Sequence, residues 1–365
     1  MLTPLLLGHL LFLPTQAPVA TAWNSAVQHG FTGGGIVVSG GKILFSGLAN
    51  GAAPKEFRIL RNTHFPVCSV TKAMTTQIVF SLVQEGKLSV SGKVGDYLPW
   101  APPFTAQISL SQLLTHTSGI RNMDTVLGPD EDGVGKIYRS FDSSFEPLKV
   151  RVLKFLGDKL VAEPGSKYDY NNTDFILLQA IAEEATKSSF QTLLQDRVFR
   201  PAGMRNSFLA EWNRPQSCVD CFSTTNGKSI QLAPFNMAMY GGSAGVISTP
   251  DDIAKWIKFT LTQPGGKSLL VSGSQFGGFQ GFGGYAYKSK AISKLLGTDR
   301  NEDVFERPGA VNGYSLQISF LPERNIAVAV FSNREGIQLG SVFEGKGLTV
   351  DLLVAASRSL GAAAK

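Results

Sequence analysis

Strand-like runs near both ends of the chain, with helix-like periods between them, constrain this fold more than any other feature. Near the start, residues 35–38 and 42–46 flank two glycines that accept positive φ, which predicts a hairpin. Near the end, residues 314–320 and 326–332 flank the turn-forming segment 322–325, which predicts a second hairpin. We therefore expect a sheet domain formed by the two ends of the chain.

The middle of the chain carries helical periods. From Ser69 to Gln84 apolar residues recur at steps of three and four, and Gly86 occupies a C-cap position. Similar periods predict helices over residues 110–114, 175–185 and 190–198, and a closing helix over 348–360. A mostly helical domain is thus inserted into the sheet domain.

The first 22 residues resemble a secretory signal. An apolar stretch too short to span a bilayer ends near residue 13, and Ala20-Thr21-Ala22 forms a cleavage site before Trp23. The segment before the apolar stretch carries no Lys or Arg, which departs from the usual signal. We expect residues 1–22 to be a signal peptide and the mature chain to be secreted or periplasmic, with no membrane span. The expected domains are then 23–62 with 240–365 for the sheet and 63–239 for the helices.

Composition excludes several classes of protein. With 43% hydrophobic residues and a net charge of +6, the chain of 365 residues is globular rather than disordered. Its positive charges are scattered, so we expect no nucleic-acid partner. Four His and three Cys give no metal-site pattern. Cys218 and Cys221 form one C-x-x-C, which fits half a zinc site, a redox pair, a local disulfide or two ordinary thiols. Cys68 is expected to be a small buried apolar residue.

Residues 241–245 match the G-x-S-x-G pattern in which a serine is the nucleophile. That mechanism takes its base from a His downstream of the serine. The last His of this chain is His116, far upstream of Ser243. The segment is therefore predicted to be a flexible Gly-rich turn without a nucleophile.

Ser69 and Lys72 offer a different nucleophile. Their side chains are three residues apart on one helical face, where a lysine can take the serine proton. Ser39 and Lys42 have the same spacing within the predicted first hairpin, where no such role is expected. The S-x-x-K spacing alone is therefore weak evidence for a nucleophile, and other motifs must support it.

Two further motifs supply that context. Tyr170-Asn171-Asn172 and Arg307-Pro308-Gly309, together with Ser69 and Lys72, resemble the S-x-x-K, Y-x-N and K-T-G or H-x-G motifs of the penicillin-recognising serine hydrolases. This family contains class C β-lactamases, D,D-peptidases and related esterases. Residues 113–119, 200–204 and 245–252 are similar to its landmarks, in its order, and the resemblance runs from about residue 24 to the C-terminal helix. It implies an α+β fold of the β-lactamase/transpeptidase type, with an antiparallel sheet flanked by the N- and C-terminal helices and an inserted mostly helical domain.

The resemblance also implies roles for residues. Ser69 would attack a carbonyl and become acylated, Lys72 would accept or relay its proton, and Tyr170 would be a second base whose phenolate is favoured by nearby positive charge. How Lys72 and Tyr170 divide the two half-reactions stays open. His116 falls in a structural turn and is expected to be buried and hydrogen-bonded. No metal or cofactor is required.

Substrate binding is implied for Asn172 and for the third motif. Asn172 would donate its amide, and the N–H groups of Ser69 and of Ala310, next to Gly309, would form the oxyanion hole. Arg307 keeps the positive charge of that motif and can grip a carboxylate, but Pro308 supplies neither a hydroxyl nor an N–H.

The departure at Pro308 favours one function over others. We expect a serine hydrolase acting on esters, small amides or peptides, ahead of a β-lactamase or D,D-carboxypeptidase. A non-turnover penicillin-binding sensor and an acyltransferase are further alternatives. The partner is a small-molecule substrate, and the sequence gives no oligomeric state.

Overall fold

The computed structural model describes residues 17–51, 53–127, 147–211, 218–232, 236–270 and 280–363, so residues 1–16 of the expected signal peptide lie outside it. The strands are β1 (Gly33–Ser39), β2 (Lys42–Ala49), β3 (Phe65–Pro66), β4 (Phe208–Leu209), β5 (Phe222–Thr225), β6 (Lys228–Gln231), β7 (Val246–Ser248), β8 (Gln280–Gly281), β9 (Gly284–Ser289), β10 (Glu302–Val311), β11 (Tyr314–Leu321) and β12 (Ile326–Ser332). The α-helices are α1 (Ala17–Gln28), α2 (Thr71–Gln84), α3 (Val94–Tyr97), α4 (Leu110–Leu114), α5 (Met123–Leu127), α7 (Leu148–Leu156), α8 (Asn172–Thr186), α9 (Phe190–Leu194), α10 (Arg200–Ala202), α11 (Gly241–Ala244), α12 (Pro250–Thr262), α13 (Pro264–Lys267), α14 (Lys290–Leu295) and α15 (Leu348–Ala363).

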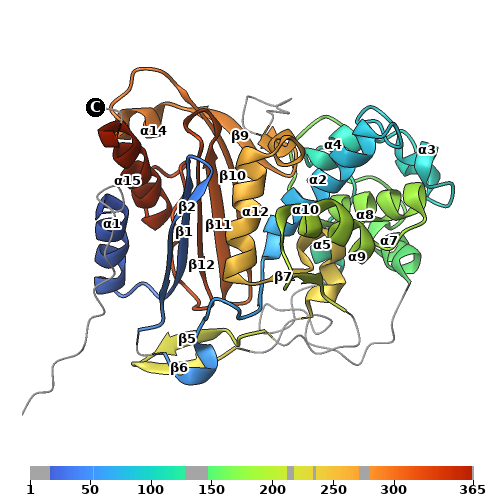
Figure 1. Cartoon of the computed structure of the whole chain (residues 1–365). Helices are drawn as coiled ribbons and strands as arrows, with labels where there is room; N and C mark the ends of the chain where they lie inside the picture. The colour runs from blue at the N-terminus through green and yellow to red at the C-terminus, as the bar shows by residue number, and fades with distance from the viewer. Residues whose placement is uncertain are drawn as a thin grey trace, which may run out of the picture.

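The two ends of the chain meet in one sheet. Its strand order is β2-β1-β12-β11-β10-β9-β8, and every described pair is antiparallel. The early strand β1 lies between β2 and the late strand β12 (Figure 1). Both predicted hairpins are confirmed, and Gly40 and Gly41 take the positive φ values of 56° and 75° that the first one requires.

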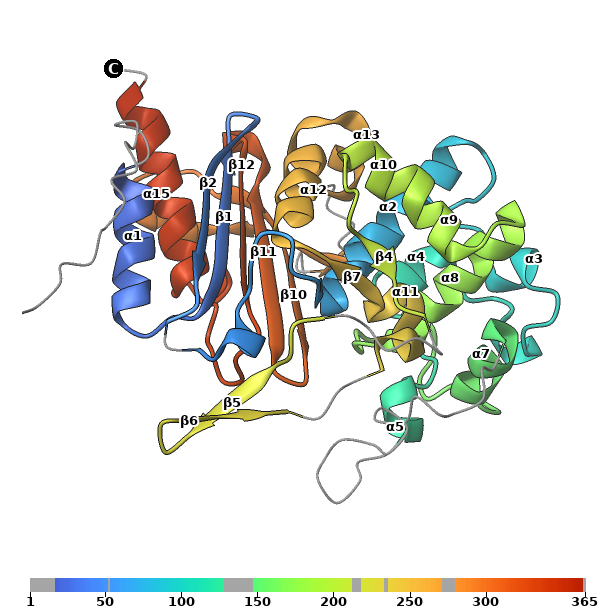
Figure 2. The same cartoon turned by 60° about the horizontal axis from the view of Figure 1, so that its bottom comes forward.

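The sheet is covered on both faces. Along β12, Ala327, Ala329 and Phe331 point into the core shared with the helical region, whereas Val328 and Val330 point into the core under α1 and α15. Figure 2 shows α1 and α15 on one side of the sheet and α12 on the other. A strand buried on both faces explains the continuous apolar run at 326–331. The expected α+β fold, with its sheet between terminal helices and an inserted helical region, is confirmed. The boundaries drawn at residues 62 and 239 stay a prediction.

The predicted helices also occur in the structure. The segment from Ser69 begins as the 3₁₀ turn η3 (Cys68–Val70) and continues as α2, and residues 190–198 form α9 followed by a π-helical turn. The strand β10 is not among the strands predicted from the sequence, and Pro308 lies within it. Proline is tolerated there because β9 pairs with β10 only as far as Glu306, so no β9 residue lies opposite Pro308.

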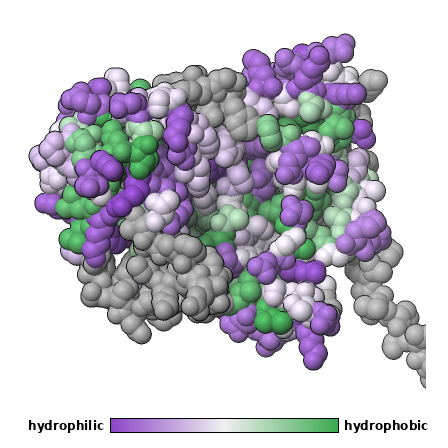
Figure 3. All heavy atoms as spheres, turned by 180° about the vertical axis from the view of Figure 1, so that it is seen from behind, coloured by the Kyte–Doolittle hydropathy of each residue, from purple (hydrophilic) through white to green (hydrophobic). Residues whose placement is uncertain are grey.

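The outer surface is mixed in polarity. Seen from behind, purple hydrophilic side chains are interspersed with smaller green apolar groups (Figure 3). Most large apolar side chains lie instead in the two cores on either side of the sheet. Within the part of the chain that the structure describes, no helix combines the length and apolarity needed to cross a bilayer.

Candidate active site

The backbone places Ser69 at a junction between the two parts of the fold. Ser69 lies in η3, directly before α2, so its hydroxyl is near the positive end of that helix dipole. The preceding Cys68 is fully buried, as predicted, and has a φ of 51°, a strained value for a residue with a side chain. A Cβ on Gly309 would lie 2.9 Å from the Ser69 nitrogen, so β10 runs directly against η3 at this point.

Two side chains from the first and second motifs, Lys72 and Tyr170, contact the Ser69 hydroxyl. Ser69 Oγ lies 2.7 Å from the Tyr170 hydroxyl oxygen, and Lys72 Nζ donates to Ser69 Oγ at 3.3 Å. Lys72 Nζ also lies 4.8 Å from the centroid of the Tyr170 ring. The structure therefore brings together the candidate nucleophile and both candidate bases, although Ser69 and Tyr170 are 101 residues apart in the chain.

Arg307 enters the same cluster from β10. Its Nη2 donates a 2.8 Å hydrogen bond to the Tyr170 hydroxyl oxygen, and its Nε donates at 3.1 Å to the Ser69 carbonyl. The side chain is only 1% exposed. Arg307 therefore acts on the other site residues rather than facing solvent.

The charges in this cluster move two pKa values toward neutrality. Burial lowers the pKa of the Lys72 ammonium from 10.5 to about 8, with Arg307 adding to the effect and Tyr170 opposing it. Burial raises the pKa of the Tyr170 hydroxyl, but the positive charges of Lys72 and Arg307 outweigh that effect and lower it from 10.0 to about 8. Either group can thus accept a proton near physiological pH.

Asn172 is also at the site, held by groups on both sides. Its Oδ1 accepts a 2.6 Å hydrogen bond from Lys72 Nζ, and its Nδ2 donates at 2.9 Å to Asp124 Oδ2. The Tyr240 hydroxyl donates to the other Asp124 oxygen at 3.0 Å. The sequence did not single out Asp124 or Tyr240, because neither lies in a motif and only the fold brings them beside Asn172.

The G-x-S-x-G segment has a different role from a nucleophile. Ser243 is fully buried, and its hydroxyl donates to a backbone carbonyl three residues earlier, so it is not available for attack. The segment forms the helical turn α11 rather than the flexible turn that was predicted. Its surroundings are closely packed, since a Cβ on Gly242 would lie 3.0 Å from the Phe175 carbonyl oxygen. The Ser243 carbonyl instead accepts a 3.0 Å hydrogen bond from Lys72 Nζ.

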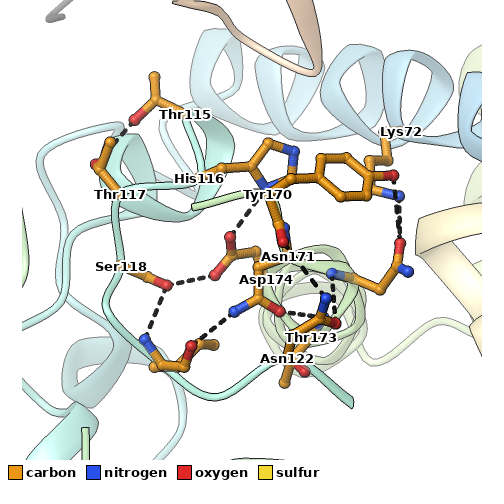
Figure 4. Close-up of polar contacts among 12 residues, drawn as sticks. Lys72, Thr115, His116, Thr117, Ser118, Asn122, Tyr170, Asn171, Thr173 and Asp174 are labelled. Carbon is orange, nitrogen blue, oxygen red and sulfur yellow. Dashed lines mark hydrogen bonds and ion pairs between the residues drawn. The ribbon is translucent and has the colours of Figure 1, made fainter. Parts of the chain in front are cut away.

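His116 lies behind Tyr170, buried and hydrogen-bonded as predicted. The Tyr170 ring lies between His116 and Lys72, with the two aromatic ring centroids 4.8 Å apart (Figure 4). His116 Nδ1 is 3.0 Å from Asp174 Oδ2 and accepts a 3.3 Å hydrogen bond from the Asn171 N–H. Burial lowers the pKa of His116 well below 6.5 and raises the pKa of Asp174 well above 3.8. Both shifts favour the uncharged form of each group, and the pair holds the segment that carries Tyr170.

The thiols give no support to a redox or metal site. Cys218 and Cys221 are unbridged, and burial raises the pKa of their thiols to about 12 and about 11, respectively. The described ranges contain no group of three or more His, Cys, Asp or Glu side chains placed to hold a metal ion. Of the readings left open for this C-x-x-C, two ordinary protonated thiols fit best.

Comparison with known proteins links the chain to one family. A family model described as Beta-lactamase matches residues 19–340. The chain is 24% identical over 340 residues to Protein flp of Staphylococcus aureus strain MW2, covering 87% of this chain and 63% of that protein. It is 24% identical over 324 residues to the D-alanyl-D-alanine-carboxypeptidase/endopeptidase AmpH of Escherichia coli K12, covering 82% of this chain and 78% of that one.

Solved structures share the fold at lower identity. One is the D-amino acid amidase from Ochrobactrum anthropi SV3 complexed with L-phenylalanine amide, with a TM-score of 0.71 and 17% identity over 96% of this chain and 99% of that chain. This similarity shows the fold.

Proposed function

We propose that this chain, a member of the Beta-lactamase family of serine hydrolases, cleaves esters and small amides through an acyl-enzyme on Ser69. The observation that carries the proposal is the contact of Ser69 Oγ with Tyr170 at 2.7 Å and with Lys72 at 3.3 Å. Ser69 is partly exposed, so a carbonyl carbon can reach its hydroxyl.

In the acylation step, Ser69 Oγ bonds to the substrate carbonyl carbon and its proton passes to the Tyr170 oxygen, which is the nearer base. The carbonyl oxygen gains negative charge, which the N–H groups of Ser69 and Ala310 would stabilise by about 3 kcal/mol each. When the bond to the leaving group breaks, that group takes the proton from Tyr170 or Lys72. An ester releases an alcohol and an amide releases an amine.

In the deacylation step, a water molecule attacks the acyl carbon and gives its proton to the same pair of bases. The bond from the acyl carbon to Ser69 Oγ then breaks, Ser69 recovers its proton, and a carboxylic acid leaves. Arg307 stays hydrogen-bonded to Tyr170 and favours its phenolate in both steps.

The test is steady-state hydrolysis of p-nitrophenyl butyrate by the full chain and by two serine variants. Ser69→Ala removes the nucleophile, and we expect turnover to fall to the background rate. Ser39→Ala is the matched control, because Ser39 has the same S-x-x-K spacing in the β1–β2 hairpin. Unchanged turnover in Ser69→Ala, or equal loss in both variants, would contradict the proposal.

Other substrates and the products they give separate the alternative functions. Relatives named as a D-alanyl-D-alanine carboxypeptidase and a D-amino acid amidase make amide substrates the second choice. Faster hydrolysis of a cephalosporin or release of D-Ala would indicate a β-lactamase or D,D-carboxypeptidase. A lasting mass adduct on Ser69 without product would indicate a sensor, and transfer products in the presence of added alcohols would indicate an acyltransferase.

We also propose that the chain is exported, on the basis of its apolar first 13 residues and the Ala20-Thr21-Ala22 site. Cleavage before Trp23 would remove the first part of α1, including the buried Val19. Mass spectrometry of the N-terminal peptide from exported protein would show whether cleavage occurs there. Finding the uncleaved chain only inside the cell would count against export.

A further inference from the structure

The two cations of the site are both engaged by protein groups. Lys72 is fully buried, and its Nζ contacts Ser69 Oγ, Asn172 Oδ1 and the Ser243 carbonyl. Arg307 is 1% exposed and donates to the Tyr170 hydroxyl and the Ser69 carbonyl. A substrate carboxylate would have to break these contacts to reach either charge. The sequence allowed Arg307 to grip a carboxylate, but its geometry assigns it to Tyr170.

A cavity of about 410 Å³ lies beside the third motif. Gly309, which lies against the Ser69 nitrogen, lines it, as does Ala310. Tyr285 also lines the cavity, and its ring centroid lies 5.9 Å from the Arg307 guanidinium, at the edge of β10 that β9 leaves unpaired beyond Glu306. We take the cavity as the space into which a substrate held at Ser69 would extend. Much of its wall is apolar, with contributions from Pro308 and Leu339 and from Phe343, whose side chain is 65% exposed.

The charge in this cavity is negative. Glu344 lines it and is exposed, and no Lys, Arg or His appears among the described residues of the wall. Glu306 also lines it but is buried, with its oxygens accepting hydrogen bonds from Tyr287, Gln317 and Ser319 and from the Val342 and Phe343 N–H groups. The Ser315 hydroxyl oxygen is buried and has no hydrogen-bond partner among the described residues, so it offers a neutral polar contact.

From these contacts we infer that the cavity beside Pro308, Gly309 and Ala310 takes an uncharged, largely apolar group of the substrate, and that Glu344 and the absence of a free cation disfavour a carboxylate there. This inference rests on the proposed function. It narrows the substrate class to neutral esters and amides and places molecules with a carboxylate beside the reacting carbonyl at a disadvantage.

Two arylboronic acids of matched shape test the inference. A boronic acid accepts the Ser69 oxygen at boron, which becomes tetrahedral, so binding needs the nucleophile but no turnover. We would measure the Kd values of 3-carbamoylphenylboronic acid and 3-carboxyphenylboronic acid, which differ by a neutral amide and a carboxylate. The expected result is at least about tenfold tighter binding of the carbamoyl compound.

Charge reversal in the cavity shows where the preference arises. Glu344→Lys should reduce the ratio of the two Kd values at least about threefold, because it replaces repulsion by attraction. Glu56→Lys, a change at an exposed residue outside the cavity wall, should leave the ratio unchanged.

Equal or tighter binding of the carboxylate, absence of binding by both probes, or a ratio insensitive to Glu344→Lys would overturn the inference. Ester turnover measured on the same preparation separates the two claims. Turnover that depends on Ser69, together with no preference between the boronic acids, sinks the inference alone. Turnover that survives in Ser69→Ala sinks the proposed function.

Discussion

The Arg307 guanidinium donates a 2.8 Å hydrogen bond to the hydroxyl oxygen of Tyr170. This contact joins the third motif on β10 to the second motif at the start of α8, in a part of the site where Lys72 adds a second positive charge. Because both cations favour the phenolate, a tyrosine that ordinarily deprotonates near pH 10 becomes a usable base.

Removing the charge of Arg307 should move the pH profile. The base must be deprotonated to act, so kcat/KM of the wild type should rise with pH around the pKa of about 8 shared by Lys72 and Tyr170. In Arg307→Gln the rising limb should shift to higher pH by about one pH unit, with roughly tenfold lower kcat/KM below it. Arg307→Lys keeps the charge and should shift less. If the rising limb of kcat/KM lies at the same pH in Arg307→Gln and Arg307→Lys, this role for Arg307 is wrong.

Loss of the Tyr170 hydroxyl should reduce kcat far more than loss of the Tyr168 hydroxyl. We expect Tyr170→Phe to lower kcat by about 100-fold to 10,000-fold, since a positioned general base is removed. Tyr168→Phe is the matched control. The Tyr168 hydroxyl contacts Tyr285 at 3.3 Å and burial raises its pKa, so it is not a base, and kcat should stay within about threefold. Similar losses in both variants would show that the effect is structural.

A methyl group on Gly309 should damage the oxyanion hole. The added Cβ would lie 2.9 Å from both the Ser69 nitrogen and the Val67 carbonyl oxygen, so the backbone must move apart. We expect kcat of Gly309→Ala to fall about 100-fold or more as the Ser69 N–H donor is displaced. Gly265→Ala is the control, because its Cβ would meet no atom closer than 3.6 Å. Wild-type kcat in Gly309→Ala would show that the Ser69 N–H does not act as a donor in the oxyanion hole.

His116 should make the fold less stable in mild acid. The unfolded chain binds a proton at His116 below about pH 6.5, but the buried imidazole beside Asp174, with Lys72 and Arg307 nearby, does not. At His116 the unfolded state thus binds more protons, which lowers the free energy of unfolding with decreasing pH by up to about 1.4 kcal/mol per pH unit. Asp174 acts in the opposite direction, because its pKa is raised in the fold, so the contribution of His116 is measured as a difference between the wild type and a His116 variant.

Urea unfolding at about pH 7.5 and 5.5 measures that slope. His116→Asn removes the titration and tolerates the φ of 57° at this position, so between about pH 7.5 and 5.5 the free energy of unfolding of the variant should fall less, or rise more, than that of the wild type. An equal pH dependence in both proteins would show that His116 does not contribute to it.

The sequence predicts those residues of the site that lie in short motifs. Ser69 and Lys72 share a helical face, and the resemblance at Tyr170 and Arg307 is enough to expect them beside that face, as the structure has them. The hairpins that form the centre of the sheet are equally visible, because turn residues and apolar runs mark them locally.

Other features depend on tertiary packing that no local pattern encodes. Asp124 reaches Asn172 only because α5 folds against the start of α8, and Ser243 contributes a carbonyl that any residue could supply. The burial of Arg307 is likewise set by its neighbours. Its charge is visible in the sequence, but the hydrogen bonds that occupy it are not.

The most direct test of the central claim is to identify the residue that carries the nucleophilic oxygen. An alkyl fluorophosphonate reacts with an activated serine when the oxygen bonds to phosphorus, fluoride leaves and the proton passes to the base. Peptide mass spectrometry of the labelled full chain should show one modified residue, Ser69, and no label in Ser69→Ala. Label on Ser243, label that persists in Ser69→Ala, or a chain that takes no label at all would contradict the account.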